Sequence, residues 1–145
     1  MKLWIAVLVS IAALTVAATA SAARSSAGTA VVDVCTARTN IGADVADIQA
    51  DIVAPGTPVD IVANLNDIGL QLRTIRAAQP ALPTALGEPV RRATTAFVVF
   101  AAPVVRGLLL APGGPAPLPR YKAFTAAQTA FGPLYAKTLG ALKCP

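Results

Sequence analysis

Apolar residues recur at intervals of three or four positions along most of this chain, and no other feature constrains its fold as strongly. The clearest series runs from Ile61 to Ile75 and places its aliphatic side chains on one face of an α-helix. Three other segments share the spacing, and none shows the alternation that is typical of a β-strand. The four series are Val34, Ile41, Val45, Ile48 and Ile52; Ile61, Leu65, Ile68, Leu72 and Ile75; Leu86, Val90, Phe97, Phe100, Val104 and Leu108; and Tyr121, Phe124, Phe131, Tyr135 and Leu142. The sequence therefore predicts an all-α chain of four helices.

Proline and glycine separate these segments. Residues 54–56 (Ala-Pro-Gly) end the first, and residues 80–89 and 112–119 predict connections without regular structure, the second an extended linker. Pro103 and Pro133 lie inside the third and fourth segments, so a kink or break is expected in each. The fourth helix is expected over about residues 120–143.

The second helix has a recognisable start. Thr57 is the predicted N-cap, Pro58 stands at the first helical position, and Asp60 occupies a place like that of the acid in a capping box.

The two cysteines test the number of helices. Cys35 lies near the start of the first predicted helix and Cys144 near the end of the fourth. In an up-down-up-down bundle of four helices these places lie at the same end, whereas three antiparallel helices would put them at opposite ends. We therefore predict an antiparallel four-helix bundle whose terminal helices are joined by a Cys35–Cys144 disulfide. In the chain-entropy model, closing so long a loop contributes about 4–5 kcal/mol. The alternative is a reactive thiol or metal pair, which no histidine or third cysteine supports.

The first 22 residues have the pattern of a signal peptide. Lys2 precedes an uncharged apolar run over residues 3–20, and small residues at positions 18, 20 and 22 predict cleavage after Ala22. The alternative is an uncleaved membrane anchor, because the run is nearly long enough to span a bilayer. We expect a flexible N-terminus over residues 23–30, a helical bundle domain over residues 31–145, and a secreted or cell-envelope location.

Charge is divided unevenly along a chain of formal net charge +5. All acids except Glu88 lie in the first two helices. Most bases follow Leu72, and these are Arg73, Arg76, Arg91, Arg92, Arg106, Arg120, Lys122, Lys137 and Lys143. This split indicates either an acidic helix pair lying beside a basic one, which we favour, or a basic surface for an anionic partner. Nucleic acid is not expected, because aromatic residues are not interleaved with the bases.

The acids Asp44, Asp47 and Asp51 share one side of a regular helix. A calcium site needs turns among its acids, so this side indicates a solvated face and no metal is expected.

Residue types that carry common catalytic chemistry are missing. The chain has no histidine, and every serine lies at or before Ser26. Serine–histidine and cysteine–histidine nucleophiles, the usual zinc sites and the usual haem sites are therefore not expected. Gly113 and Gly114 lie between prolines with no lysine following, unlike a phosphate-binding loop. The sequence predicts a protein that is not an enzyme and has no cofactor.

The third segment is unusually apolar, because Arg106 is the one charged residue from Ala93 to Ala111. It indicates a central helix buried all round or a surface or cavity for an apolar ligand. A third alternative is insertion into a membrane, which is disfavoured because Pro103 and Arg106 lie in the segment. The candidate lining residues are Phe97, Phe100, Val104, Leu108, Phe124 and Phe131.

We expect a small secreted, non-catalytic helical protein that binds an apolar small molecule or a component of the cell envelope, protein or lipid. One alternative is an extracellular protein-binding module, either an inhibitor or an envelope adaptor, that uses the basic C-terminal half. A second is a membrane-active helical protein in peripheral contact with a bilayer.

Overall fold

The computed structural model describes residues 14–50, 58–109 and 118–144. These residues form four α-helices and no strand, which confirms the all-α prediction. The elements are α1 (Leu14–Ala50), α2 (Pro58–Ala78), α3 (Thr84–Leu109) and α4 (Leu118–Lys137), with short 3-10 helices η1 (Gln79–Ala81) and η2 (Leu139–Ala141).

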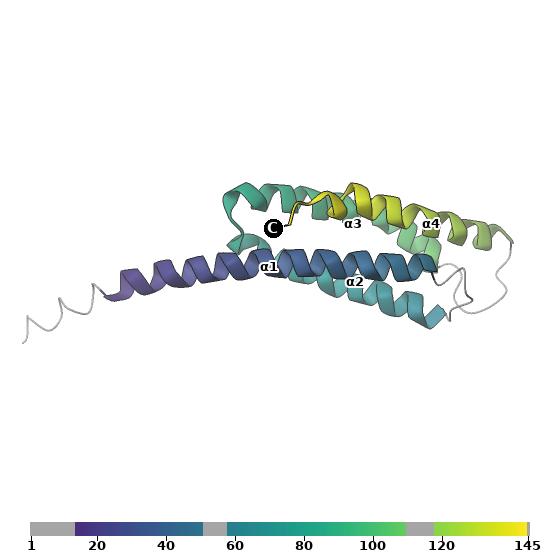
Figure 1. Ribbon diagram of the computed structural model, residues 1–145. Helices are drawn as coiled ribbons and strands as arrows, with labels where there is room; N and C mark the ends of the chain where they lie inside the picture. Colours follow the sequence, from purple (N-terminus) through teal and green to yellow (C-terminus); the bar gives the residue numbers. More distant parts are fainter. Residues whose placement is uncertain (1–13, 51–57, 110–117, 145) are drawn as a thin grey trace, which may run out of the picture.

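Helix α1 is longer than the apolar spacing predicted. It includes residues 23–30, where we expected a flexible segment. From Ser26 on, where burial is described, the first buried side chain of α1 is that of Ala30. The part of α1 that precedes Ala30 projects beyond the other helices (Figure 1). Cys35 consequently lies within the helix and not near its start.

Helix α2 begins at Pro58 and carries Asp60 in its first turn, as the sequence predicted. Three residues with predicted roles, Asp51, Ile52 and Thr57, lie outside the described part of the chain, as do residues 1–13 and 112–117. Helix α4 ends at Lys137, earlier than predicted, because the chain turns at Thr138 into η2.

The helices continue through their prolines, so neither Pro103 nor Pro133 breaks its helix, and a kink at either stays a prediction. Pro89, expected in a connection, lies in α3. A proline in a helix leaves the carbonyl four residues earlier without its usual donor. All three prolines lie on exposed positions, and so do the residues four before them, Ala85, Val99 and Thr129. Water therefore has access to the region of the freed carbonyls.

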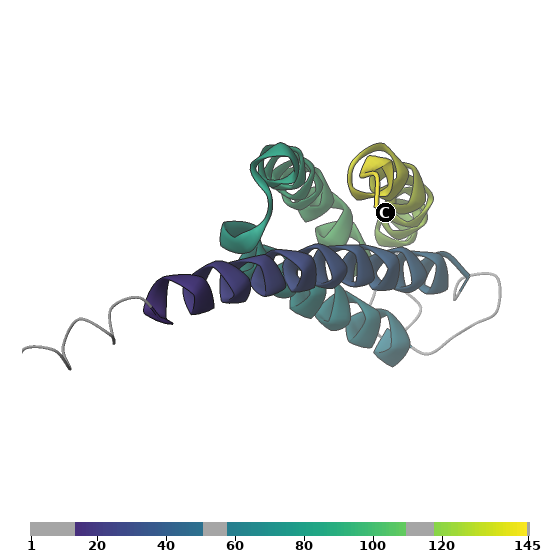
Figure 2. The same cartoon turned by 60° about the vertical axis from the view of Figure 1, so that its left-hand side comes forward.

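The helices pack mainly as two pairs, α1 with α2 and α3 with α4 (Figures 1 and 2). Further contacts join α1 to α4 and α2 to α3. The α1–α3 and α2–α4 pairs do not approach each other directly among the described residues, so they lie diagonally across the bundle.

The predicted apolar faces of all four helices meet in one core. Its largest fully buried side chains are Phe97, Phe131, Ile41, Ile48, Ile75, Leu139 and Val45. Phe97 of α3 stacks on Phe131 of α4 with ring centroids 6.1 Å apart, and meets Tyr135 edge-on at 6.5 Å. This aromatic group links α3 to α4, and edge-on and offset rings contribute beyond their buried area.

Replacing Phe97 with alanine is expected to lower the free energy of unfolding by about 3–5 kcal/mol, because the fully buried ring leaves a cavity. Phe100→Ala is the matched control, since 58% of Phe100 is exposed, and its effect is expected to be about 0.5 kcal/mol or less. Urea denaturation measures both values. Similar losses in the two variants would contradict the assignment of Phe97 to the core and Phe100 to the surface.

Candidate apolar binding pocket

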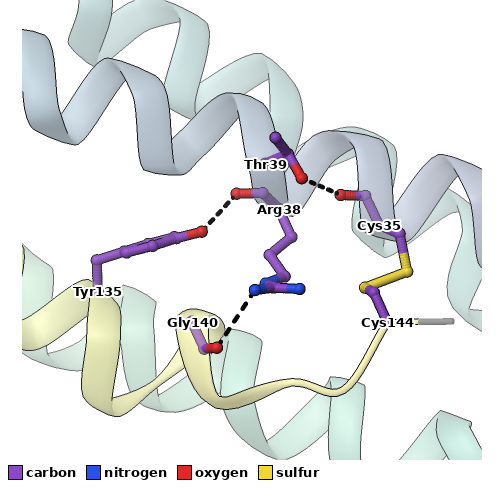
Figure 3. Close-up of a disulfide and its surroundings, with 6 residues drawn as sticks. All are labelled: Cys35, Arg38, Thr39, Tyr135, Gly140 and Cys144. Atoms are coloured by element: carbon purple, nitrogen blue, oxygen red, sulfur yellow. Dashed lines mark hydrogen bonds between the residues drawn. A yellow bond between two sulfur atoms is a disulfide. The ribbon is translucent and has the colours of Figure 1, made fainter.

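The predicted disulfide is present and joins Cys35 to Cys144, with 5.7 Å between their Cα atoms. Its surroundings differ from the prediction of a bond between two helix ends. Cys35 lies on the side of α1, whereas Cys144 follows η2 in a segment without regular structure (Figure 3). The bond therefore attaches residues 141–144, which we call the C-terminal segment, to the flank of α1.

Two hydrogen bonds hold the same junction one turn along α1 from the disulfide. The hydroxyl of Tyr135 donates to the backbone carbonyl of Arg38 at 2.8 Å, and Arg38 Nη2 donates to the carbonyl of Gly140 at 3.4 Å (Figure 3). Arg38 thus accepts a bond from α4 and donates one to η2. Together with the disulfide, these bonds fix the end of the chain against α1 at separate points.

A glycine in α1 makes this close approach possible. A Cβ added at Gly42 would lie 2.7 Å from the hydroxyl oxygen of Tyr135, a distance that real Cβ atoms essentially never show. The absence of a side chain at Gly42 therefore lets the phenol reach the backbone of α1.

The turn that starts the C-terminal segment is anchored in the core. The Thr138 hydroxyl donates to the Leu134 carbonyl at 2.7 Å at the end of α4, and Leu139 is fully buried. From this anchor the chain crosses to Cys35.

The C-terminal segment forms one wall of a pocket of about 290 Å³. A second wall comes from α1 through Val31, Val34 and Cys35, and a third from Leu82 and the first turns of α3, through Leu86 and Val90. The C-terminal segment itself contributes Leu142, Lys143 and Cys144. The pocket thus occupies the space between α1 and α3, the diagonal pair that does not pack directly. Lys143 is the one charged residue among the described residues that line it.

The candidate site expected from the sequence lies elsewhere, between α3 and α4. Phe97, Leu108 and Phe131 are buried in the core, and Val104 and Phe124 are partly buried against it. Phe100 does not join them, because its ring is exposed. None of the six lines the pocket beside the disulfide, and their contribution to ligand binding stays a prediction.

Sequence analysis missed the pocket because three segments far apart in the chain form it. The available signal was the disulfide, which places Leu142 and Cys144 beside Val34 and Cys35. The position of Leu82 and Leu86 opposite them follows only from the packing of α3.

The outward face of α3 is apolar but open to solvent. Val98, Val99, Phe100 and Leu109 are all about half exposed or more, so α3 is not a central helix buried all round. Only 22% of its most apolar stretch is buried. By length and composition alone, α3 is the one helix in the described part of the chain that could cross a bilayer, a criterion that core helices of soluble proteins also meet.

The charged residues form local groups. Glu88 accepts hydrogen bonds from Arg91, both at 2.8 Å, and lies 3.5 Å from Arg92, all on the exposed side of α3. The hydrogen bond from Arg91 is the main reason that the pKa of Glu88 is lowered.

Asp44 of α1 lies near other acids, Asp47 of α1 and Asp67 of α2. Burial raises the pKa of Asp44, and repulsion from Asp67 and then Asp47 adds to the effect. Within the described residues no group of three His, Cys, Asp or Glu side chains is placed to hold a metal ion.

Comparisons with models of protein families, with curated proteins and with solved structures found no match to this chain. The function must therefore be argued from the pocket and the surfaces themselves.

Gly42→Ala is expected to destabilise the protein by roughly 1–3 kcal/mol, because the new methyl group displaces Tyr135 from α1. Gly69→Ala in α2 is the control. A Cβ there meets nothing within 4 Å, so the replacement is expected to stabilise the helix by about 0.5–1 kcal/mol. Thermal or urea unfolding reports both changes, and stabilisation by both variants would show that Tyr135 does not pack against Gly42.

Proposed function

We propose that this chain is a small exported, non-catalytic binding protein that holds an apolar ligand in the pocket beside its disulfide. The observation that carries the proposal is the pocket itself, whose described lining is apolar except for Lys143 and the cystine. Concave sites with mostly apolar walls and a few polar groups are the usual form of small-molecule sites. The ligand is a small molecule or part of a cell-envelope lipid.

The size of the pocket indicates a small ligand. Its volume of about 290 Å³ is near the lower end of the range found for small-molecule sites. We expect a short unbranched chain of about eight carbons with a small headgroup to enter it.

Export is supported by the disulfide and by the sequence. A disulfide is compatible with an extracellular location, where such bonds persist. Residues 1–22 have the charge, apolar run and small residues of a signal peptide. Cleavage after Ala22 leaves every described residue of the pocket lining in place, because the first of these is Val31.

The proposed topology is an antiparallel up-down-up-down bundle. The connections from α1 to α2 and from α2 to α3 are short, and helices consecutive in sequence are neighbours in space. This helix order brings the C-terminal segment back to the flank of α1, where it forms a wall of the pocket.

A non-catalytic role is supported by the residue types present. The chain has no histidine, and the described lining of the pocket contains no acid. The described lining therefore lacks the histidine, acid and serine side chains of the common acid–base and nucleophile pairs.

The open apolar face of α3 favours one alternative, a membrane-active protein. Val98, Val99 and Leu109 offer apolar surface to a bilayer, and Arg106 offers a charge for its headgroups. A membrane-active protein releases dye from liposomes, whereas a soluble carrier does not. The protein-binding alternative would show partner binding that weakens strongly with salt.

The oxidised protein is expected to bind 1-octanol, a neutral chain of the predicted size, in the pocket. Leu86→Trp should abolish this binding, because an indole at that position occupies the space between α1 and α3. Val99→Trp, on the exposed face of α3, should leave it unchanged. NMR titration of the backbone amides measures both effects. Unaltered binding by Leu86→Trp, or no octanol binding by the wild-type protein, would contradict the proposed site.

A further inference from the structure

Lys143 is the one charged residue in the described lining of the pocket, so it indicates which headgroup a ligand carries. It lines the pocket between Leu142 and Cys144, yet the residue is exposed. A lysine in such a place lays its aliphatic stem along apolar surface and keeps its ammonium in water. The described lining of the pocket therefore combines apolar side chains with one exposed basic residue.

The ammonium of Lys143 is available to a ligand. Lys143 forms no ion pair with any residue that the structure describes. Glu88, which precedes the lining residue Pro89, is already bound by Arg91 and Arg92. No acid is therefore placed in the described lining to compete for the ammonium.

The backbone at Lys143 is also held in place. The next residue is covalently attached to α1 through the disulfide, and Gly140, three residues earlier, accepts a hydrogen bond from Arg38. A charge on a fixed segment loses less conformational freedom when it binds than one on a mobile terminus.

We propose that the ligand is an amphipathic monocarboxylate, a short unbranched acid whose tail fills the pocket and whose carboxylate pairs with Lys143. This inference rests on the proposed function and adds the headgroup to it. Carboxylates form charge-assisted hydrogen bonds with ammonium groups. A short tail is consistent with a pocket of about 290 Å³.

The test compares octanoate with 1-octanol at pH 7.5, where octanoate is ionised, by NMR titration of the full oxidised protein. The wild-type protein should bind octanoate about fivefold more tightly than octanol, the size expected for an ion pair in contact with solvent. Lys143→Gln should remove this preference and leave octanol binding unchanged, and Lys143→Arg should keep it. Lys122→Gln, an exposed lysine of α4 that does not line the pocket, controls for net charge and should keep the preference.

The outcomes separate the two proposals. Equal binding of octanoate and octanol, or a preference that survives in Lys143→Gln, overturns the assignment of Lys143 while the apolar pocket stands. A preference lost equally in Lys122→Gln also overturns it, because the effect is then one of net charge. Binding of neither compound overturns the proposed function and this inference with it.

Discussion

The disulfide between Cys35 and Cys144 attaches the non-helical segment after η2 to the side of α1. The hydrogen bonds and the pocket beside the disulfide depend on this attachment. Cys35 points from the flank of α1, so the end of the chain is drawn across the space between α1 and α3. Tyr135 and Arg38 add hydrogen bonds to the same junction, and Gly42 makes room for them. The cross-link lowers the conformational entropy of the unfolded chain, which is the usual explanation of its stabilising effect. It also forms part of one wall of the pocket.

The pocket follows from how the four helices pack. Helices that lie diagonally opposite each other are farther apart than neighbours, and core side chains normally fill the space between them. Over most of the molecule Ile41, Ile48 and Phe97 belong to that core. At the disulfide end residues 142–144, which have no regular structure, occupy this space. A cavity with apolar walls remains, and the exposed lysine at its edge is the only described charge that lines it.

Much of the fold was predictable from the sequence, because helical spacing and disulfide formation depend on local pattern and on the number of cysteines. The apolar faces of α1 and α2, the start of α2 at Pro58 and the Cys35–Cys144 pairing are all confirmed. The prolines do not break their helices as the prediction allowed, and the residues four positions before Pro103 and Pro133, Val99 and Thr129, are exposed. Phe100 misled the prediction, because it follows Phe97 at helical spacing, yet the buried position is that of Ala101, four residues after Phe97, and Phe100 is exposed. The pocket was beyond sequence analysis, because its walls meet only after α3 packs against the rest of the bundle.

The account is tested most directly by locating a bound apolar chain on the molecule. Intermolecular nuclear Overhauser effects between 1-octanol and the methyl groups of the oxidised protein report which side chains it touches. We predict contacts with Val34, Leu86 and Leu142, one from each wall of the pocket. Contacts with Val99 and Leu109 instead would place the ligand on the open face of α3 and contradict the account.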